Sequence, residues 1–163
     1  MKTIDIIIDQ QEKTPWSFPT THATTRVEHM KTGDYALVGD DRFSIERKSI
    51  DDYAGTLSSG WERFKRELDR MDKFISQIIV VEGRFLDLCF WIHESEDDQE
   101  YELVPPVHNH SRITPQFMML QTAILALRGV SVLFAEDAEI AAALGYTILK
   151  QRADQLEKEN SSE

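Results

Sequence analysis

Charged side chains gather at the end of one predicted strand, in the stretch RFSIERKSIDD. Its first residues alternate between apolar and polar, which is typical of a strand with one buried face. Glu46, Arg47 and Lys48 then follow without a break. Two more acids, Asp51 and Asp52, come just after them. Opposed charges at this density indicate a binding or catalytic site at the end of the strand.

A predicted hairpin, DYALVGDDRFSIERK, brings another carboxylate to the same place. If the turn centres on Asp40, then Asp34 lies directly opposite Glu46. Because strand side chains alternate between two faces, Asp34, Glu46 and Lys48 share one face. The other face is apolar and comprises Tyr35, Leu37, Phe43 and Ile45.

Two directly opposed carboxylates repel each other and need a cation between them. Mg²⁺ or Mn²⁺ suits such a pair, since these hard ions bind one or two carboxylates together with waters and phosphate oxygens. Asp9, at the end of the predicted first strand, is a candidate third acid, and Glu12 follows it closely. The alternative is structural: Asp34 belongs to a turn, and Glu46 pairs with Lys48 on an exposed edge.

The spacing of these residues resembles the GD…ERKxxxD signature of the XPF-type structure-specific nuclease domain. The matching residues are Gly33, Asp34, Glu46, Arg47, Lys48 and Asp52. The stretch IIIDQQE resembles the family's first strand and its D-x-R-E motif, with Asp9 and Glu12 matching and Gln11 standing where the family usually has arginine. RFKREL resembles the basic helix after the signature. The resemblance is dense from Ile4 to Val81 and covers the rest as a pattern only.

This resemblance implies a restriction-endonuclease-like fold and a metal-dependent DNA endonuclease acting on branched, flapped or forked DNA. In that reading Asp34 and Glu46 bind the metal ion, Asp9 binds it directly or through water, and the carbonyl of Arg47 is a further ligand. Lys48 orients the attacking water or neutralises charge on the phosphate. The complete predicted catalytic set is Asp9, Glu12, Asp34, Glu46, Arg47, Lys48 and Asp52.

Arg47 and Asp52 are predicted supports of this site. Strand parity points Arg47 toward the apolar face, where its charge requires a partner. We expect it to contact Asp52 or Glu12, although an arginine that extends to solvent at the sheet edge fits equally well. Asp52 either caps the helix that begins near Asp51 or supports the site.

A basic stripe lies on the predicted helix WERFKRELDRMDKFI, where Arg63, Arg66, Arg70 and Lys73 recur at three- and four-residue spacing. Such a stripe can follow a DNA backbone, and we assign Arg63, Arg66 and Lys48 to DNA contact. The alternative is a solvated face with Glu62–Arg66 and Asp69–Lys73 pairs. Trp16 is expected to belong to the core rather than to stack on a base.

Two other functions remain open for this sequence. A nuclease fold can bind DNA structures or a protein partner without cutting, and the same fold serves restriction enzymes and recombination exonucleases. Inactive relatives usually lose the signature carboxylates or the lysine. Asp34, Glu46 and Lys48 are all present, which favours activity.

Strands and helices alternate along the chain around the predicted site. The expected strands are 3–9, 25–31, 77–83 and 130–135, together with the two strands of the hairpin. One expected helix begins near Asp51, another begins at Thr114, and two more cover 61–75 and 137–152. Residues 84–92 form a short helix or a strand, and we favour the helix. Residues 94–112 form a polar acidic insertion or loop. We predict an α/β fold, three-layer α/β/α with a central mixed β-sheet, in one nuclease domain (1–150) followed by a polar tail (151–163). The end of this tail, QLEKENSSE (155–163), is expected to fray.

Composition limits the cellular setting. The chain has 163 residues, 41% of them hydrophobic, which suits one domain with its own core. Its formal net charge of −11 argues against broad non-specific nucleic-acid binding, although residues 42–73 are locally basic. No apolar run approaches about 20 residues, so we expect no membrane contact. The single cysteine, Cys89, allows no internal disulfide, which favours a reducing compartment. The expected location is the cytoplasm, prokaryotic or phage-like and nucleoid-associated, or the nucleus in a eukaryote.

The expected partners are DNA with single-strand/double-strand junctions and a second copy of the chain or another protein. Apolar residues in 117–127 and 140–149 supply a candidate surface for such a homodimer or complex. These segments serve equally well as ordinary core.

Overall fold

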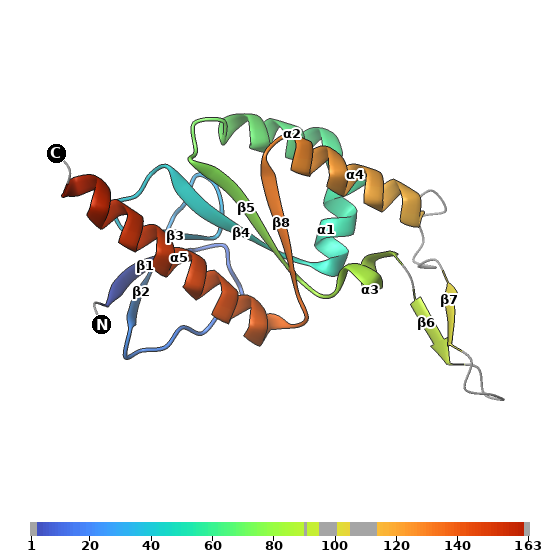
Figure 1. Ribbon diagram of the computed structural model, residues 1–163, viewed down its shortest axis with the longest axis horizontal. Helices are drawn as coiled ribbons and strands as arrows, with labels where there is room; N and C mark the ends of the chain where they lie inside the picture. The colour runs from blue at the N-terminus through green and yellow to red at the C-terminus, as the bar shows by residue number, and fades with distance from the viewer. Residues whose placement is uncertain (1–2, 90, 95–100, 105–113, 162–163) are drawn as a thin grey trace.

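The computed structural model describes residues 3–89, 91–94, 101–104 and 114–161. A mixed sheet with the order β2-β1-β3-β4-β5-β8 forms its centre. The strands are β1 (Ile4–Asp9), β2 (Ala23–Glu28), β3 (Tyr35–Leu37), β4 (Phe43–Ser49), β5 (Ser76–Glu82) and β8 (Val130–Ala135). A separate antiparallel hairpin, β6 (Trp91–Glu94) with β7 (Tyr101–Val104), projects away from the sheet in Figure 1.

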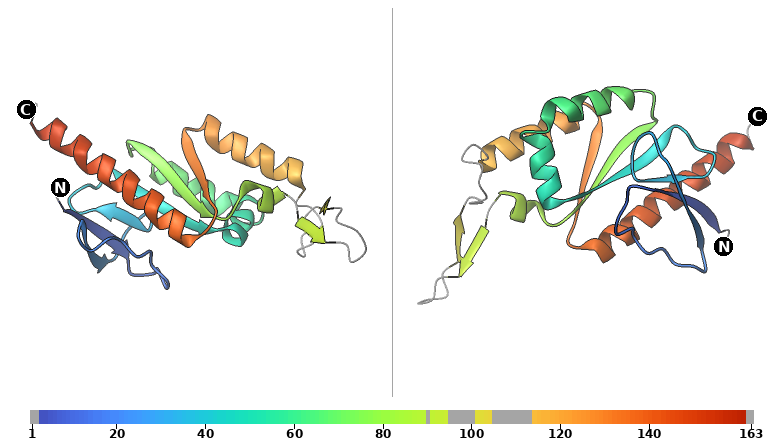
Figure 2. Two further views of the ribbon diagram at one scale, coloured as in Figure 1. Left: turned by 60° about the horizontal axis from the view of Figure 1, so that its bottom comes forward. Right: turned by 180° about the vertical axis from the view of Figure 1, so that it is seen from behind.

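The helices cover both faces of this sheet, as the sequence predicted. They are α1 (Ile50–Leu57), α2 (Trp61–Arg70), α3 (Phe85–Cys89), α4 (Pro115–Leu127) and α5 (Ala138–Asn160). Helix α5 crosses the front of the sheet in Figure 1, whereas α1 and α2 face the viewer when the molecule is turned around in Figure 2. The architecture is therefore three-layered α/β/α.

Two apolar clusters separate the layers. The cluster under α5 includes Ile6, Ile8 and Ile45 from the sheet and Leu149 from the helix. The cluster under α1, α2 and α4 is built on alternate residues of β5 and on β8. Strand β5 contributes Val80 to the first cluster and its neighbours Ile79 and Val81 to the second. This period-two alternation fixes which polar residues face α1 and α2.

The β3–β4 hairpin has the predicted register. Tyr35 pairs with Ile45, and the Asp34 N–H donates to the Ile45 carbonyl at 2.8 Å. Gly33 precedes this pair with φ of 75°, and a Cβ there would lie 2.3 Å from the Ser44 Oγ. Only glycine permits this close approach, which holds Asp34 beside the end of β4.

Several predicted boundaries were wrong. The helix predicted over 61–75 ends at Arg70, and the helix predicted over 84–92 stops at Cys89 and is followed by strand β6. Strand β7 falls inside the predicted insertion 94–112; residues 95–100 and 105–113 of that prediction lie outside the described part of the chain.

The predicted fraying of residues 155–163 was also wrong over the described part, because α5 continues to Asn160. Arg152, at the end of the predicted helix, is buried and donates from Nε to Asp40 Oδ2 at 2.7 Å. Its Nη1 donates to Glu159 at 3.1 Å. This contact with the β3–β4 hairpin thus helps to hold the last part of α5, whose own sequence is polar. Helix starts were predicted better: Thr114 and Asp137 cap α4 and α5.

In the part of the chain that the structure describes, no helix combines the length and the apolar character that a membrane crossing requires.

Candidate active site

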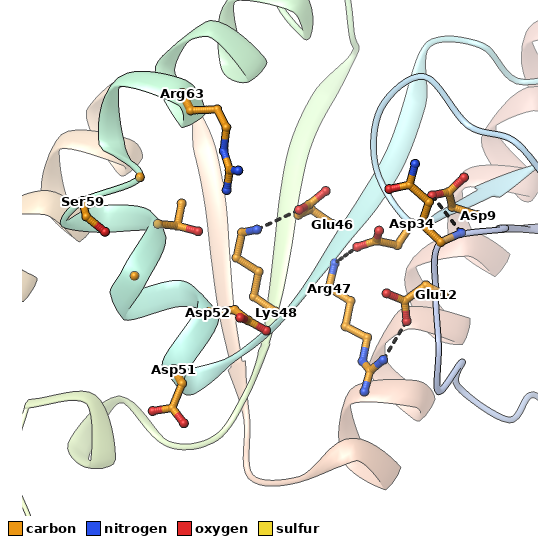
Figure 3. Close-up of a pocket in the computed structure, with 14 residues that line it drawn as sticks. Asp9, Glu12, Asp34, Glu46, Arg47, Lys48, Asp51, Asp52, Ser59 and Arg63 are labelled. Carbon is orange, nitrogen blue, oxygen red and sulfur yellow. Dashed lines mark hydrogen bonds and ion pairs between the residues drawn. The ribbon is translucent and has the colours of Figure 1, made fainter. Parts of the chain in front are cut away.

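A cavity of about 700 Å³ opens between the end of β4, helix α1 and the segment that follows β1. Its lining combines Asp9, Gln11, Glu12, Asp34, Glu46, Arg47, Lys48, Asp51, Asp52 and Arg63 with small residues of α1 and the α1–α2 turn. Figure 3 shows Arg63 extending from α2 above Lys48 and Glu46, with Asp34 on the neighbouring chain segment. Every predicted site residue except Arg66 therefore lies at one cavity.

Asp34 and Glu46 form the acidic centre of this cavity. Asp34 is half-buried, and its Oδ2 accepts the Arg47 backbone N–H at 2.7 Å. Burial, together with repulsion from Glu46, raises the pKa of Asp34 to about 8. Burial also raises the pKa of Glu46, although the charge of Lys48 opposes this increase. Two buried carboxylates beside each other resist ionisation, and a nearby positive charge would favour their ionised forms.

Lys48 is the only cationic side chain that contacts Glu46 among the described residues. Its Nζ lies 2.8 Å from Glu46 Oε1 and 5.7 Å from the centroid of the Phe64 ring. The side chain is 13% exposed, so the ammonium is held at the cavity wall instead of extending into solvent. The ion pair predicted as the structural alternative exists, but it lies inside the site and not on an exposed edge.

Arg47 points to the opposite side of β4 and braces the site. Its Nη1 donates to Glu12 Oε2 at 2.6 Å, which confirms one of the two expected partners. Its Nε and Nη2 bind both oxygens of Glu82, at 2.7 and 3.0 Å. These hydrogen bonds raise the pKa of Arg47 above its ordinary value and, against the effect of burial, lower the pKa of Glu82.

Glu82 is a residue that the sequence reasoning missed. It ends β5, which pairs in parallel with β4 and places Glu82 beside Ser49. Its Oε1 also accepts the indole N–H of Trp16 at 2.7 Å. An acid that directly follows a run of buried β-branched residues, as in IIVVEG, was the available signal.

Trp16 belongs to the core, as expected, and is 5% exposed. Its ring stacks on Tyr35 with centroids 4.3 Å apart. The Tyr35 hydroxyl accepts the Trp16 backbone N–H at 3.0 Å and donates to Glu12 at 3.3 Å. The loop after β1 is therefore tied to the hairpin through Glu12, Glu82 and Arg47.

Asp9 lines the cavity, but its carboxylate already has partners. Oδ1 accepts the Met30 N–H at 2.8 Å, and Oδ2 accepts the Gln11 N–H at 3.4 Å. Nowhere in residues 3–89, 91–94, 101–104 and 114–161 do three acidic, histidine or cysteine side chains gather closely enough for a protein-only metal cage. A cation here would therefore depend on few side chains together with backbone, water and phosphate oxygens.

The donor set fits such a cation. Mg²⁺ and Mn²⁺ accept one or two carboxylates and complete their coordination with a carbonyl, waters and substrate oxygens. Asp34 and Glu46 provide hard carboxylate oxygens, and burial is the main cause of their raised pKa values. The Arg47 carbonyl is the third candidate donor. The N–H and the carbonyl of one strand residue point to the same side, and the Arg47 N–H binds Asp34.

Asp52 serves the helix and not Arg47. The Ser49 hydroxyl accepts the Asp52 N–H at 3.1 Å and donates to the Asp52 carboxylate at 2.8 Å. This reciprocal pair caps α1 directly after β4. The N-cap is therefore Ser49, and Asp52 takes part in this cap from the first turn of α1 while it also lines the cavity.

The basic stripe of α2 is free of the pairs predicted for a solvated face. Glu62 pairs with Lys65 and Asp69 pairs with Arg128. Arg63, Arg66, Arg70 and Lys73 form no ion pair with the described residues. Arg63 lines the cavity, whereas Arg66 is exposed outside it.

Comparison with known proteins agrees with this geometry. The ERCC4 domain matches residues 8–147, so the chain belongs to the ERCC4 domain family. No curated protein matches it.

The fold is that of the XPF nuclease domain. The chain is similar to XPF from Aeropyrum pernix, with a TM-score of 0.66 and 20% identity over 96% of this chain and 69% of that one. XPF from Aeropyrum pernix in complex with DNA gives a TM-score of 0.64 and 20% identity, over 93% of this chain and 66% of that one. The predicted restriction-endonuclease-like α/β class is thus confirmed.

Proposed function

We propose that this protein is a Mg²⁺- or Mn²⁺-dependent endonuclease that hydrolyses phosphodiester bonds in branched, flapped or forked DNA. The observation that carries the proposal is the pair Asp34 and Glu46. These carboxylates line one cavity beside Lys48, and each has a raised pKa caused first by burial. Family membership and the likeness to an XPF structure with DNA support the same assignment.

Asp34, Glu46 and the Arg47 carbonyl would hold the cation, with Asp9 reaching it through water. When bound, a divalent cation there polarises the phosphate and promotes ionisation of a coordinated water. Asp9 is better suited to a water-mediated contact because both of its oxygens accept backbone N–H groups. The cation would add to the positive charge that Lys48 brings to Glu46.

Lys48 provides the main protein charge in the proposed reaction. The water oxygen forms a bond to phosphorus while the bond to the leaving sugar oxygen breaks, and negative charge builds on the phosphate oxygens. An ammonium at the cavity wall stabilises that charge without moving. Its contact with Glu46 holds it in place before DNA arrives.

Arg47 acts as a positioning residue in this scheme. Its guanidinium is fixed by Glu82 and Glu12, so its backbone N–H and carbonyl are fixed as well. The N–H orients Asp34, and the carbonyl faces the proposed cation. Glu82 and Glu12 thus act on the reaction through Arg47.

Arg63 and Arg66 are proposed to bind the DNA backbone next to the reacting phosphate. Arg63 lines the cavity and both side chains lack ion pairs with the described residues. Such contacts position the substrate without reading its sequence. The overall charge of −11 restricts this binding to the locally basic region around α2.

A cleavage panel tests the function. Flap, fork, four-way junction, single-stranded and linear duplex DNA, each labelled at one end, would be incubated with Mg²⁺, Mn²⁺ or EDTA. We expect cleavage of the branched substrates that needs the cation and is abolished in Asp34→Asn. Binding without cleavage of any substrate would indicate a DNA-binding module, and preference for linear ends would indicate an exonuclease.

A second copy or another protein is the proposed partner besides DNA. Helix α4 exposes Met119, Leu120 and Leu127, the last of them by 89%. An apolar helix face of this kind favours an interface. Light scattering on the wild type and on Leu127→Glu would test it, since the substitution should lower the association state if α4 lies at the contact.

A further inference from the structure

A second cavity lies on the same face of the sheet as the proposed active site. It has a volume of about 710 Å³ and is bounded by the segment after β2, the β3–β4 hairpin and the end of α2. Ser44 lines this cavity, and Glu46 and Lys48, further along the same side of β4, line the active site. Two residues along a strand span about 7 Å, so the cavities adjoin.

The basic stripe of α2 connects the two cavities. Arg63 lines the active site and Arg70 lines the second cavity. Seven residues of helix separate them by about 10 Å along the axis. A B-form strand carries one phosphate per roughly 3.4 Å of axis, so this distance corresponds to about three phosphates. Arg66 lies between them on the same helical face and forms no ion pair with the described residues.

The lining of the second cavity suits a nucleotide. Phe74, which is half-buried, supplies aromatic surface, and Met30 adds apolar surface. Phe43 also borders the cavity, but its side chain belongs to the cluster under α5. Lys31 and Arg70 are exposed cations at its rim, without ion pairs among the described residues. Aromatic rings bind the face of an unpaired base, while cations bind its phosphate.

The two acids of the lining do not contradict this assignment. Asp40 is neutralised by the buried guanidinium of Arg152, at 2.7 Å. Asp41 is exposed and is the one remaining anion of the lining, which thus contains the cations Lys31 and Arg70 against a single uncompensated acid.

Resting on the function proposed above, we propose that this cavity, which we call the base pocket, binds one unpaired nucleotide of single-stranded DNA about three phosphates from the scissile bond. A base held in duplex stacking cannot enter such a cavity, so its occupation requires a single strand beside the site. The base pocket would therefore supply part of the selection for branched over fully paired DNA.

Abasic scanning tests the base pocket. A fluorescent flap substrate would carry one abasic residue at each of six positions on either side of the cut, and its affinity would be measured by anisotropy in EDTA. We expect one position, two to four nucleotides from the cut, to raise Kd about 10-fold, in line with the loss of one base–aromatic stack. All other positions should change Kd less than about 2-fold, so a flat profile would overturn the proposal.

Arg70→Ala and Phe74→Leu identify the pocket. Both variants should bind intact DNA more weakly and should lose the extra penalty at the sensitive position. Arg26→Ala, an exposed arginine on β2 outside the α2 stripe, is the matched control and should keep that penalty. Thermal melts would establish that Phe74→Leu is folded, and Arg70 is fully on the surface. A penalty that persists in both variants would place the base elsewhere.

The scan separates this inference from the proposed nuclease function. Binding in EDTA needs no cleavage, so a protein that never cuts DNA can still reveal the base pocket. Conversely, cation-dependent cleavage with a flat abasic profile would retain the nuclease and remove the pocket. A uniform loss of affinity in Arg70→Ala at every position would make Arg70 a simple phosphate contact and would also overturn the pocket.

Discussion

The two ends of the β3–β4 hairpin each bury an aspartate, but they treat its charge in opposite ways. At the turn, Asp40 binds Arg152, and both side chains are at most 3% exposed. At the open end, Asp34 receives the backbone N–H of Arg47 and faces Glu46, without an ion pair to a described cation. One end is a completed ion pair, and at the other end we propose that a cation supplies the missing charge.

This difference separates stability from function within a single hairpin. A buried charge with a well-placed partner is costly to break, whereas like charges held together already cost free energy in the folded state. Such strain persists where the surrounding structure enforces it, and it is commonest at functional sites. Substitutions at the open end should therefore change activity, and substitutions at the turn should change stability.

The largest expected effect is on catalysis, at Lys48. Lys48→Ala should lower the cleavage rate about 10³-fold, because the developing phosphate charge loses its positioned ammonium. DNA affinity should change less than about 3-fold, measured by anisotropy in EDTA. Single-turnover cleavage of a flap substrate measures the rate, with Lys65→Ala, another lysine near α2, as the control. Normal cleavage by Lys48→Ala in Mg²⁺ would refute its role.

The next effect is on stability, at the turn. Arg152→Met should lower the free energy of unfolding by about 3 kcal/mol, because it leaves Asp40 buried without a partner. Urea unfolding would measure the loss. The double variant Asp40→Asn with Arg152→Met should recover part of it, and cleavage by folded protein should stay near the wild-type rate. Equal losses in the single and double variants would mean that the ion pair is not the cause.

Asp34→Asn should stabilise the folded protein, whereas Arg152→Met at the turn should destabilise it. The raised pKa of Asp34, about 8, means that its contribution to folding stability is complete below the unfolded pKa near 4 and is lost as pH rises to 8. At pH 8.5 in EDTA the neutral asparagine should stabilise the protein by about 2 kcal/mol and raise Tm by several degrees. At pH 4 the gain should vanish.

The control for this effect is the cation itself. Saturating Mg²⁺ should raise the Tm of the wild type and leave that of Asp34→Asn unchanged, because bound ligand stabilises only the form that binds it. Asp41→Asn, an exposed acid of the same hairpin, should behave as the wild type. A Tm gain with Mg²⁺ in Asp34→Asn would place the cation elsewhere.

The smallest effect is expected at Glu82. Glu82→Gln removes the charge that binds both guanidinium nitrogens of Arg47 but keeps the shape of the side chain. We expect about a 10-fold lower cleavage rate with little change in KM, since Arg47 positions Asp34 and does not bind DNA. An unchanged rate with a lowered Tm would make Glu82 a purely structural residue. The Mn²⁺ to Mg²⁺ rate ratio should also rise, a change that a structural role would not produce.

Local patterns predicted much of the site and the fold. Strand alternation and a turn at Asp40 were enough to pair Tyr35 with Ile45, and the structure has that register. Capping residues located the starts of α4 and α5 for the same reason, since a cap depends on a few consecutive residues. The roles of Asp34, Glu46 and Lys48 stay predictions that the cleavage experiments address.

The sequence did not predict the contacts between distant segments. Glu82 lies 35 residues from Arg47, and nothing local indicates that β5 pairs with β4 in the register that joins them. Near the end of α5, Arg152 binds Asp40, 112 residues away, and Ala153 and Leu156 pack against the apolar cluster under this helix. In both cases the contacts join segments that meet only after the sheet has formed.

By itself, the sequence determined which residues share a strand face, because side-chain alternation follows from backbone geometry. It therefore placed Asp34, Glu46 and Lys48 together and turned Arg47 away from them. Only the tertiary structure decided which charges are neutralised: Arg47 by Glu12 and Glu82, and Asp40 by Arg152. Neutralisation depends on burial and on partners brought from distant elements: Glu46 has Lys48 beside it, whereas Asp34 has no ion pair with a described cation.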